Sequence, residues 1–125
     1  MARVVKQLPF DGGYLYDVLT GAKRITIRRY RQGKHDFNAG EVIYGDFKGE
    51  LKILIRITAK VDLKPFGSLT KAEAREDGFN DANDAFNDLR KYYPQLKKTE
   101  MAAVIRFEVA KIDGVPAVSL SGERE

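Results

Sequence analysis

The alternation of apolar and polar residues from Leu51 to Leu63 is the feature that most constrains the fold of this chain. Its apolar positions are Ile53, Ile55, Ile57, Ala59, Val61 and Leu63, and its polar positions include Lys52, Arg56, Thr58, Lys60 and Asp62. Because the side chains of a strand alternate between two faces, this pattern predicts a strand with one face in the core and one in solvent. Thirteen residues would extend roughly 43 Å if straight, too far for a small domain, so we expect the strand to bend or coil around a barrel.

Further strands are predicted by shorter apolar runs between turn residues. We expect them at residues 3–8, 24–28, 41–47, 103–112 and 115–120. In the second of these, period two sends Ile25 and Ile27 to one face and Arg24, Thr26 and Arg28 to the other. Thr26 and Arg28 are therefore expected to project together. Asp113-Gly114 is a strong signal for a two-residue hairpin between the last two strands.

Three short helices are expected between the strands. The first covers residues 14–19 and ends at Gly21, a residue suited to a helix C-terminal cap. The second starts at Thr70, which forms a capping box with Glu73, and ends at Gly78. The third begins at Asp81 and is stopped by Pro94; its apolar stripe is Ala82, Ala85, Phe86 and Leu89. This order of elements predicts an α+β fold.

Length and composition favour one globular domain. The 125 residues fall within the range of a single domain, and no repeat, low-complexity tract or flexible linker divides them, so we predict one domain over residues 1–125. Without cysteine there are neither disulfides nor thiolate metal sites, and the single histidine, His35, cannot form a histidine-rich metal centre. We expect no metal or cofactor. No apolar run approaches membrane-spanning length and no signal-peptide core is present, so we expect a cytoplasmic protein.

Charge is distributed unevenly along the chain. Six cations and no acid lie between Lys23 and Lys34, whereas six acids lie between Glu73 and Asp88. The molecule is therefore expected to have a positive side and a negative side. A net charge of +4 permits contact with nucleic acid without requiring it.

Three segments, in this order, resemble the ASCH domain family of the PUA-like superfamily. Residues 19–28, Leu-Thr-Gly-Ala-Lys-Arg-Ile-Thr-Ile-Arg, are similar to the family's G-x-K-x-x-T-x-R element. Residues 68–79 resemble its helix that ends in an acidic residue just before a turn, here Asp77. Tyr92-Tyr93-Pro94 followed by residues 103–107 is similar to its Y-P step into the closing strand. The resemblance implies a PUA-like mixed β-barrel with short flanking helices and a cleft beside them.

RNA-related roles recur across that superfamily, so the resemblance implies binding of RNA or a modified nucleoside in a basic cleft. The residues expected to bind are Lys23, Arg24, Thr26, Arg28, Arg29 and Asp77. The cations would neutralise phosphates, and Asp77 would accept a hydrogen bond from a base amine or a ribose hydroxyl. Four tyrosines, Tyr14, Tyr16, Tyr30 and Tyr44, are candidates for base stacking.

One branch of the family consists of small amidohydrolases that remove the acetyl group of N4-acetylcytidine with a lysine, a threonine and a glutamate. These positions resemble Lys23, Thr26 and Asp77, where aspartate replaces the family's glutamate and is one methylene shorter. An enzyme acting on N4-acetylcytidine or a related acylated amine is therefore the alternative function. Thr26 would attack the carbonyl and Lys23 would take its proton, which requires lowering a lysine pKa by about three units, or roughly 4 kcal/mol.

Structural interpretations of the same residues stay open. Thr26 fits a β-branched strand residue, Lys23 and Arg28 fit a solvated strand face, and Asp77 fits a surface helix end. His35 lies in a polar loop and is expected to be exposed, and Tyr92 and Tyr93 are expected to pack before Pro94. A module that binds other proteins is a third function class. The sequence leaves the natural ligand and the oligomeric state open.

Overall fold

The computed structural model describes residues 6–48 and 51–120 of the chain. Its main sheet contains, in spatial order, β1 (Gln7–Phe10), β3 (Val42–Phe47), β4 (Leu51–Ile57), β6 (Met101–Val109) and β2 (Ile25–Arg29). Two more strands join this sheet: β5 (Asp62–Pro65) pairs with β6, and β9 (Val118–Leu120) pairs with β4. A separate hairpin is formed by β7 (Lys111–Ile112) and β8 (Val115–Pro116). The helices are α1 (Leu15–Thr20), α2 (Lys71–Glu76) and α3 (Ala82–Leu89), with short 3-10 turns at Gly12–Tyr14 and Phe66–Ser68.

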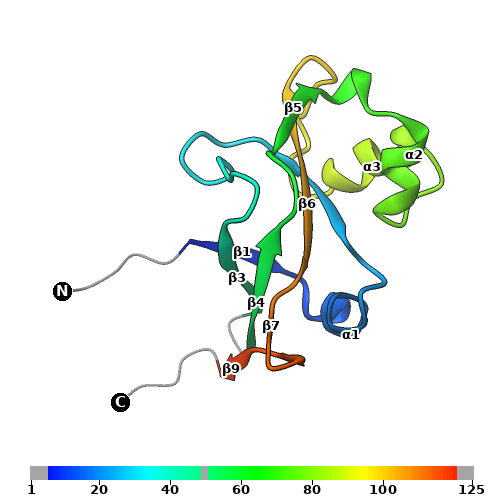
Figure 1. Ribbon diagram of the computed structural model, residues 1–125. Helices are drawn as coiled ribbons and strands as arrows, with labels where there is room; N and C mark the ends of the chain where they lie inside the picture. Colours follow the sequence, from blue (N-terminus) through cyan, green and yellow to red (C-terminus); the bar gives the residue numbers. More distant parts are fainter. Residues whose placement is uncertain (1–5, 49–50, 121–125) are drawn as a thin grey trace.

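The sheet curls into a half-barrel, with α2 and α3 together on one side of β6 and β2 (Figure 1). β1 pairs with β3 in parallel, and every other described pairing is antiparallel. This is the α+β class predicted from the sequence. The longest described helix, α3, has eight residues, and no helix in residues 6–48 or 51–120 is long and apolar enough to cross a membrane.

The long alternating segment forms two strands along the same edge of β6. Ile57 lies opposite Phe107 and Asp62 lies opposite Val104, so the intervening chain carries two more residues than β6 does over the same distance. Extra residues of this kind act like a bulge, bending and twisting the strand. The predicted bend is therefore confirmed, whereas one continuous strand from Leu51 to Leu63 is wrong.

The alternation predicts that all six apolar positions from Ile53 to Leu63 face the core, but the last of them does not. Ile53, Ile55 and Ile57 are fully buried, but Leu63 is 42% exposed. Leu63 lies in β5, which has β6 as its single partner in the described sheet and therefore forms an edge that solvent reaches.

β6 is the strand that separates two hydrophobic cores. Ala103, Ile105 and Phe107 pack with β1, β3 and β4 on the concave side of the sheet. Ala102 and Val104, on the opposite face, pack with residues of α3 and of the segments beside it. A strand that is buried on both faces shows little apolar and polar alternation. The continuous apolar run at the start of β6 reflects this position.

β2 is likewise covered on both faces. Ile25 and Ile27 pack in the core beneath the helices. Thr26 lies opposite Ile105 and Arg28 opposite Ala103, so these two polar side chains face the concave side of the half-barrel. The predicted pairing of Thr26 with Arg28 on one face is confirmed, and that face is enclosed by the fold instead of open to solvent.

The remaining elements follow the sequence closely. Of the strand predicted at residues 3–8, residues 3–5 lie outside the described residues, and the observed β1 starts later, at Gln7. Asp113 and Gly114 both have positive φ, 54° and 79°, as a two-residue hairpin with a primed turn requires. The strand predicted at 103–112 ends at Val109, after which β7 turns away to pair with β8.

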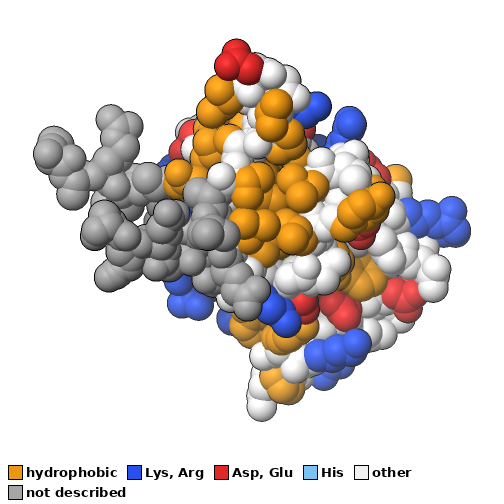
Figure 2. Space-filling view, turned by 90° about the horizontal axis from the view of Figure 1, so that it is seen from below, with side chains coloured by type: hydrophobic (Ala, Val, Ile, Leu, Met, Phe, Trp, Pro, Cys, Tyr) orange, Lys and Arg blue, Asp and Glu red, His pale blue; other side chains and the backbone are white. Residues whose placement is uncertain are grey.

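The end of the molecule formed by β7, β8 and β9 is apolar. Ile112, Val115 and Val118 from these strands are exposed. Figure 2 views the molecule from this side and shows hydrophobic side chains gathered beside the residues drawn in grey. This surface lies away from α2 and α3 (Figure 1).

Candidate functional site

A cavity of about 550 Å³ lies between β2, the C-terminal end of α2 and the segment that follows α3. Thr26, Arg28 and Asp77 line it together with Lys23, although Asp77 follows the others by about fifty positions. We call it the Asp77 cavity. Its volume is within the range of roughly 300–1,000 Å³ typical of small-molecule sites.

Lys23 and Asp77 form a buried ion pair in this cavity. The Lys23 ammonium donates to Asp77 Oδ1, and the two side chains are only 9% and 6% exposed. The other carboxylate oxygen, Oδ2, accepts a hydrogen bond from the backbone N–H of Ile27 at 3.1 Å. The Lys23 ammonium also lies 4.7 Å from the centroid of the Tyr14 ring, a cation–π contact. A solvated strand face is therefore the wrong interpretation of Lys23.

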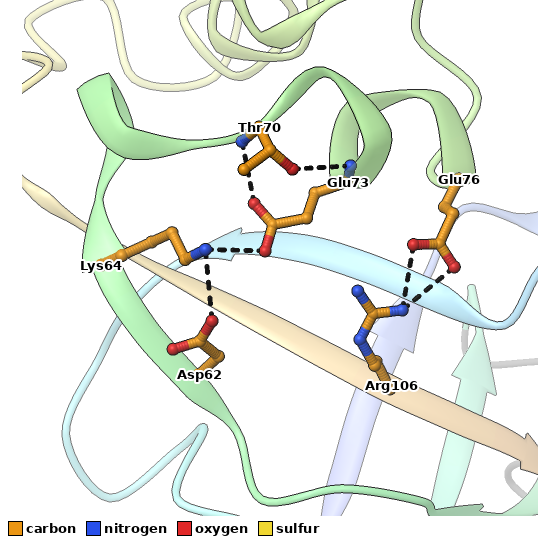
Figure 3. Close-up of polar contacts among 6 residues, drawn as sticks. All are labelled: Asp62, Lys64, Thr70, Glu73, Glu76 and Arg106. Carbon is orange, nitrogen blue, oxygen red and sulfur yellow. Dashed lines mark hydrogen bonds and ion pairs between the residues drawn. The ribbon is translucent and has the colours of Figure 1, made fainter.

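The position of Asp77 depends on how α2 is attached to the sheet (Figure 3). At the start of the helix, Thr70 and Glu73 form the predicted capping box, with bonds of 3.1 Å and 2.9 Å between side chains and backbone N–H groups. Lys64 of β5 donates to the same Glu73 carboxylate at 2.8 Å. Burial acts to raise the pKa of Glu73, but Lys64 and the Thr70 N–H together hold it below its usual value.

The end of α2 is attached as well. Arg106 of β6 donates to both carboxylate oxygens of Glu76 at 3.0 Å, one residue before Asp77 (Figure 3). The backbone N–H of Asp77 closes the helix on the carbonyls of Glu73 and Ala74. Gly78 then turns the chain with a φ of +95°. These contacts place the Asp77 carboxylate against β2.

Lys23 is positioned by the end of α1. Gly21 takes the left-handed conformation, with a φ of 84°, and caps the helix as predicted. Two residues later, the backbone N–H of Lys23 donates to the carbonyl of Asp17 at 2.9 Å. The chain is thereby bent back toward the cavity before β2 begins at Ile25.

Thr26 and Arg28 form the second polar pair of the cavity. Arg28 Nε donates to Thr26 Oγ1 at 2.9 Å, and the guanidinium lies 5.0 Å from the centroid of the Phe10 ring. Burial lowers the pKa of Arg28, while Asp77 acts in the opposite direction. Because arginine stays protonated in proteins, its donors remain available to an oxyanion or a phosphate.

The Asp77 carboxyl has a perturbed acidity. Burial raises its pKa above the ordinary value, although Lys23, the Ile27 N–H and Arg28 all act to lower it. We attribute the raised pKa to the loss of hydration, which disfavours the carboxylate form. A buried carboxyl group with a raised pKa at the wall of a cavity is typical of a functional site.

Two of the six predicted site residues lie outside the Asp77 cavity. Arg24 is exposed, and its Nε donates to the carbonyl of Gly21 at 3.0 Å. Arg29 pairs with Glu100 at 3.1 Å and its guanidinium lies 5.0 Å from the Tyr93 ring centroid. Arg24 was expected on the same face as Thr26. Because β2 begins only at Ile25, the alternation of strand side chains does not extend to Arg24.

The aromatic lining was only partly predicted. Tyr14 lines the cavity as proposed, and burial together with the charge of Asp77 raises its pKa. Tyr92 and Tyr93 also line it and are 68% and 37% exposed, so the prediction that they pack before Pro94 is wrong. They follow α3 in a turn. Two adjacent tyrosines after a helix end were the signal for exposed rings, since neighbouring side chains rarely enter one core together.

A second cavity of about 430 Å³ adjoins the first and shares Arg28 and Tyr93 with it. We call it the Arg31 cavity. Among the described residues that line it, none is Asp or Glu and five are cations, namely Lys6, Arg28, Arg29, Arg31 and Lys34. The Asp77 cavity is mixed, with three cations, Lys23, Arg28 and Lys48, and three acids, Asp11, Asp77 and Asp88. The expected basic cleft is thus two adjoining cavities of different charge.

His35 lines the Arg31 cavity and is buried, so the prediction of an exposed histidine is wrong. Its Nδ1 accepts a hydrogen bond from the backbone N–H of Arg31 at 3.0 Å. Burial, followed by the charge of Arg28, lowers the pKa of the ring. The neutral ring therefore carries its proton on Nε2. Within the described residues, no group of three or more His, Asp or Glu side chains is arranged to hold a metal ion.

Comparisons with known proteins bear on the fold. No family model matches the chain, and no curated protein matches it. The structure is similar to the crystal structure of protein EF3133 from Enterococcus faecalis V583, which is assigned to the family model DUF984. The TM-score is 0.62 at 17% sequence identity, and the alignment covers 100% of this chain and 88% of that protein. Together with the curled sheet and its short helices, this likeness supports the predicted PUA-like β-barrel as the fold class.

Proposed function

We propose that this protein is of the ASCH type and binds RNA or a modified nucleoside in the Asp77 cavity. The observation that carries the proposal is the buried Lys23–Asp77 pair, which opens onto a cavity lined by aromatic rings. The carboxyl group offers an acceptor for a base amine or a ribose hydroxyl. Burying an ion pair costs desolvation energy, so a pair at a cavity wall is more typical of a ligand site than of a stabilising core.

The aromatic side chains supply the apolar part of the interaction. Tyr14, Tyr92 and Tyr93 line the cavity and offer ring faces for stacking. Stacking of a base on an aromatic side chain contributes about 1–3 kcal/mol. A nucleobase combines a flat apolar face with a polar edge, which suits tyrosine rings beside Asp77 and Thr26. Free phosphate would leave these rings unused.

Equilibrium titration with cytidine, N4-acetylcytidine and single-stranded RNA tests this function. We expect Tyr92→Ala to weaken binding of each ligand by about fivefold or more, because one stacking contact is lost. Tyr16→Ala is the matched control, since Tyr16 is exposed and does not line the cavity. Equal affinities of both variants and the parent protein for every ligand, or no binding by the parent protein at all, would contradict the proposal.

The second candidate function is that of an amidohydrolase acting on N4-acetylcytidine or a related acylated amine. It is favoured by the hydrogen bond from Arg28 to the Thr26 hydroxyl beside the Lys23–Asp77 pair. For this chemistry Lys23 would first have to pass its proton to Asp77; Thr26 Oγ1 would then bond to the acetyl carbon and give its proton to Lys23. Arg28 would stabilise the oxyanion of the tetrahedral intermediate.

In the next step the bond from the acetyl carbon to N4 breaks, and N4 takes the proton from Lys23. Cytidine leaves, and Thr26 remains as an acetyl ester. Water then attacks the ester carbon and gives one proton to Lys23. The bond from this carbon to Thr26 Oγ1 breaks, Oγ1 takes the proton from Lys23, and acetic acid leaves and ionises to acetate. Because Asp77 reaches Lys23 directly in this structure, the missing methylene does not prevent contact between the two groups.

Incubation with N4-acetylcytidine, followed by chromatography for cytidine and acetate, tests the enzyme. Hydrolysis should disappear in Thr26→Val and persist in Tyr16→Ala. Binding of N4-acetylcytidine without any product at high protein concentration would remove this candidate and leave the binding function in place.

A further inference from the structure

We propose that the Arg31 cavity is a phosphate subsite, so that the ligand is a nucleotide, free or within a strand, and not a free nucleoside. The inference rests on the proposed function, because it places the base of the same ligand in the Asp77 cavity. It starts from the cationic lining of the Arg31 cavity and from the side chains that the two cavities share.

Three of the five cations around the Arg31 cavity form no direct ion pair within the described residues. Lys6 pairs with Glu41 at 2.7 Å and Arg29 pairs with Glu100. Arg28, Arg31 and Lys34 take part in no ion pair with any residue in the described ranges 6–48 and 51–120. Like charges around one concavity repel each other, and an anion bound between them relieves that repulsion.

The loop that carries Arg31 and Lys34 is held in shape by its own hydrogen bonds. Asp36 accepts from the Tyr30 hydroxyl at 2.6 Å and from the Gly33 backbone N–H at 2.7 Å. The carboxylate of the loop is therefore engaged within the loop and does not line the cavity. The Lys34 backbone N–H donates to the Arg31 carbonyl at 3.0 Å, which closes the turn between the two cations.

His35 adds a neutral donor to the cation-lined cavity. Its Nδ1 is occupied as an acceptor by the Arg31 N–H, so the ring proton on Nε2 is free to be donated. Cations together with a neutral N–H donor suit a phosphate, whose several oxygens accept hydrogen bonds at once. A carboxylate offers fewer acceptors, and a base has no charge to match this lining.

The two cavities share Pro9, Arg28, Leu89 and Tyr93, so one ligand can extend from one into the other. Arg28 lies at the junction, bonded to Thr26 on the side of the Asp77 cavity. Its remaining guanidinium N–H groups are available for a phosphate oxygen. A base beside Asp77 with its phosphate beyond Arg28 uses the mixed-charge Asp77 cavity and the basic Arg31 cavity at once.

The test compares cytidine with cytidine 5′-monophosphate, cytidine 3′-monophosphate, an eight-residue oligocytidylate and inorganic phosphate. For the parent protein we expect at least one monophosphate to bind about tenfold tighter than cytidine. The double variant Arg31→Ala/Lys34→Ala should bind that monophosphate no better than cytidine, with cytidine affinity unchanged. The two monophosphates and the oligomer together distinguish a free nucleotide from a strand phosphate.

The matched control is Lys60→Ala/Lys71→Ala, which removes the same charge from exposed positions that line neither cavity. For the oligomer, we compare the logarithm of the association constant with the logarithm of the salt concentration. The magnitude of this slope should fall by about 0.7 for each cation removed at Arg31 and Lys34. Equal losses in the test and control variants, or equal affinity of the parent protein for cytidine and both monophosphates, would overturn the phosphate subsite.

The phosphate subsite and the proposed function can fail separately. If cytidine does not bind, but inorganic phosphate binds and is lost in Arg31→Ala/Lys34→Ala alone, the phosphate subsite stands and the nucleoside function falls. If cytidine binds in a Tyr92-dependent way but phosphate adds no affinity, the nucleoside function stands and the phosphate subsite falls.

Discussion

The ammonium of Lys23 and the carboxylate of Asp77, 54 positions apart in the sequence, meet as a buried ion pair at the wall of a cavity. Lys23 is positioned by the capped end of α1, and Asp77 by the capped end of α2. Each helix end is held by its own turn glycine and by hydrogen bonds to neighbouring backbone. The site is thus built where two short helices end against one strand.

Breaking this pair should destabilise the protein strongly. Asp77→Leu leaves the Lys23 ammonium buried without its counter-charge, and we expect the free energy of unfolding to fall by about 3–5 kcal/mol. The double variant Lys23→Met/Asp77→Leu should recover most of this loss, because no unpaired charge remains. Urea unfolding of the parent and both variants measures the effect. Equal stability of the single and double variants would contradict the expectation.

Two substitutions of Thr26 test whether its hydroxyl contributes to ligand binding or whether the residue only packs in the strand. Thr26→Val keeps the β-branched shape and removes the acceptor for Arg28, whereas Thr26→Ser keeps the hydroxyl and loses a methyl group. We expect ligand affinity to survive in the serine variant and to fall about tenfold in the valine variant. The opposite order, measured by titration with the tightest ligand, would assign Thr26 to packing alone.

The attachment of α2 should affect affinity through Asp77. Thr70→Val removes the capping hydrogen bond to the Glu73 N–H and should cost about 1 kcal/mol of stability. Because the Lys64–Glu73 contact remains, we expect the fold to persist and ligand affinity to fall by less than in Asp77→Asn. Thermal unfolding and titration of the same samples check both parts. A Thr70→Val protein with parental stability would show that the cap is dispensable.

The lowered pKa of His35 predicts how the stability of the protein depends on pH. Its pKa in the folded protein is below the value of about 6.5 expected when unfolded, so the unfolded chain binds the proton first on acidification. Its contribution to stability is therefore complete above about pH 6.5 and decreases as the pH falls below that value. His35→Asn, which keeps a hydrogen-bond acceptor but does not titrate, should lose less stability between pH 7 and pH 5. Identical losses in the two proteins, measured by urea unfolding, would exclude this role of the histidine.

Much of the fold was predictable because local signals agreed with tertiary structure. Gly21, the Thr70–Glu73 capping box and Asp113-Gly114 each act over a few residues, and all three occur as predicted. The long alternating segment predicted correctly that the strand must bend. Its division into β4 and β5 was not predictable, because the two extra residues are defined only by the pairing with β6.

The candidate site separates what the sequence determined from what tertiary structure decided. Alternation within β2 determined that Thr26 and Arg28 share a face, since strand geometry acts between neighbours. Only the packing of α1 and α2 against β2 decided that Lys23 meets Asp77, and only the folded loop decided that His35 is buried. Burial, charge pairing and cavity shape depend on segments far apart in the chain. No local pattern of residues specifies them.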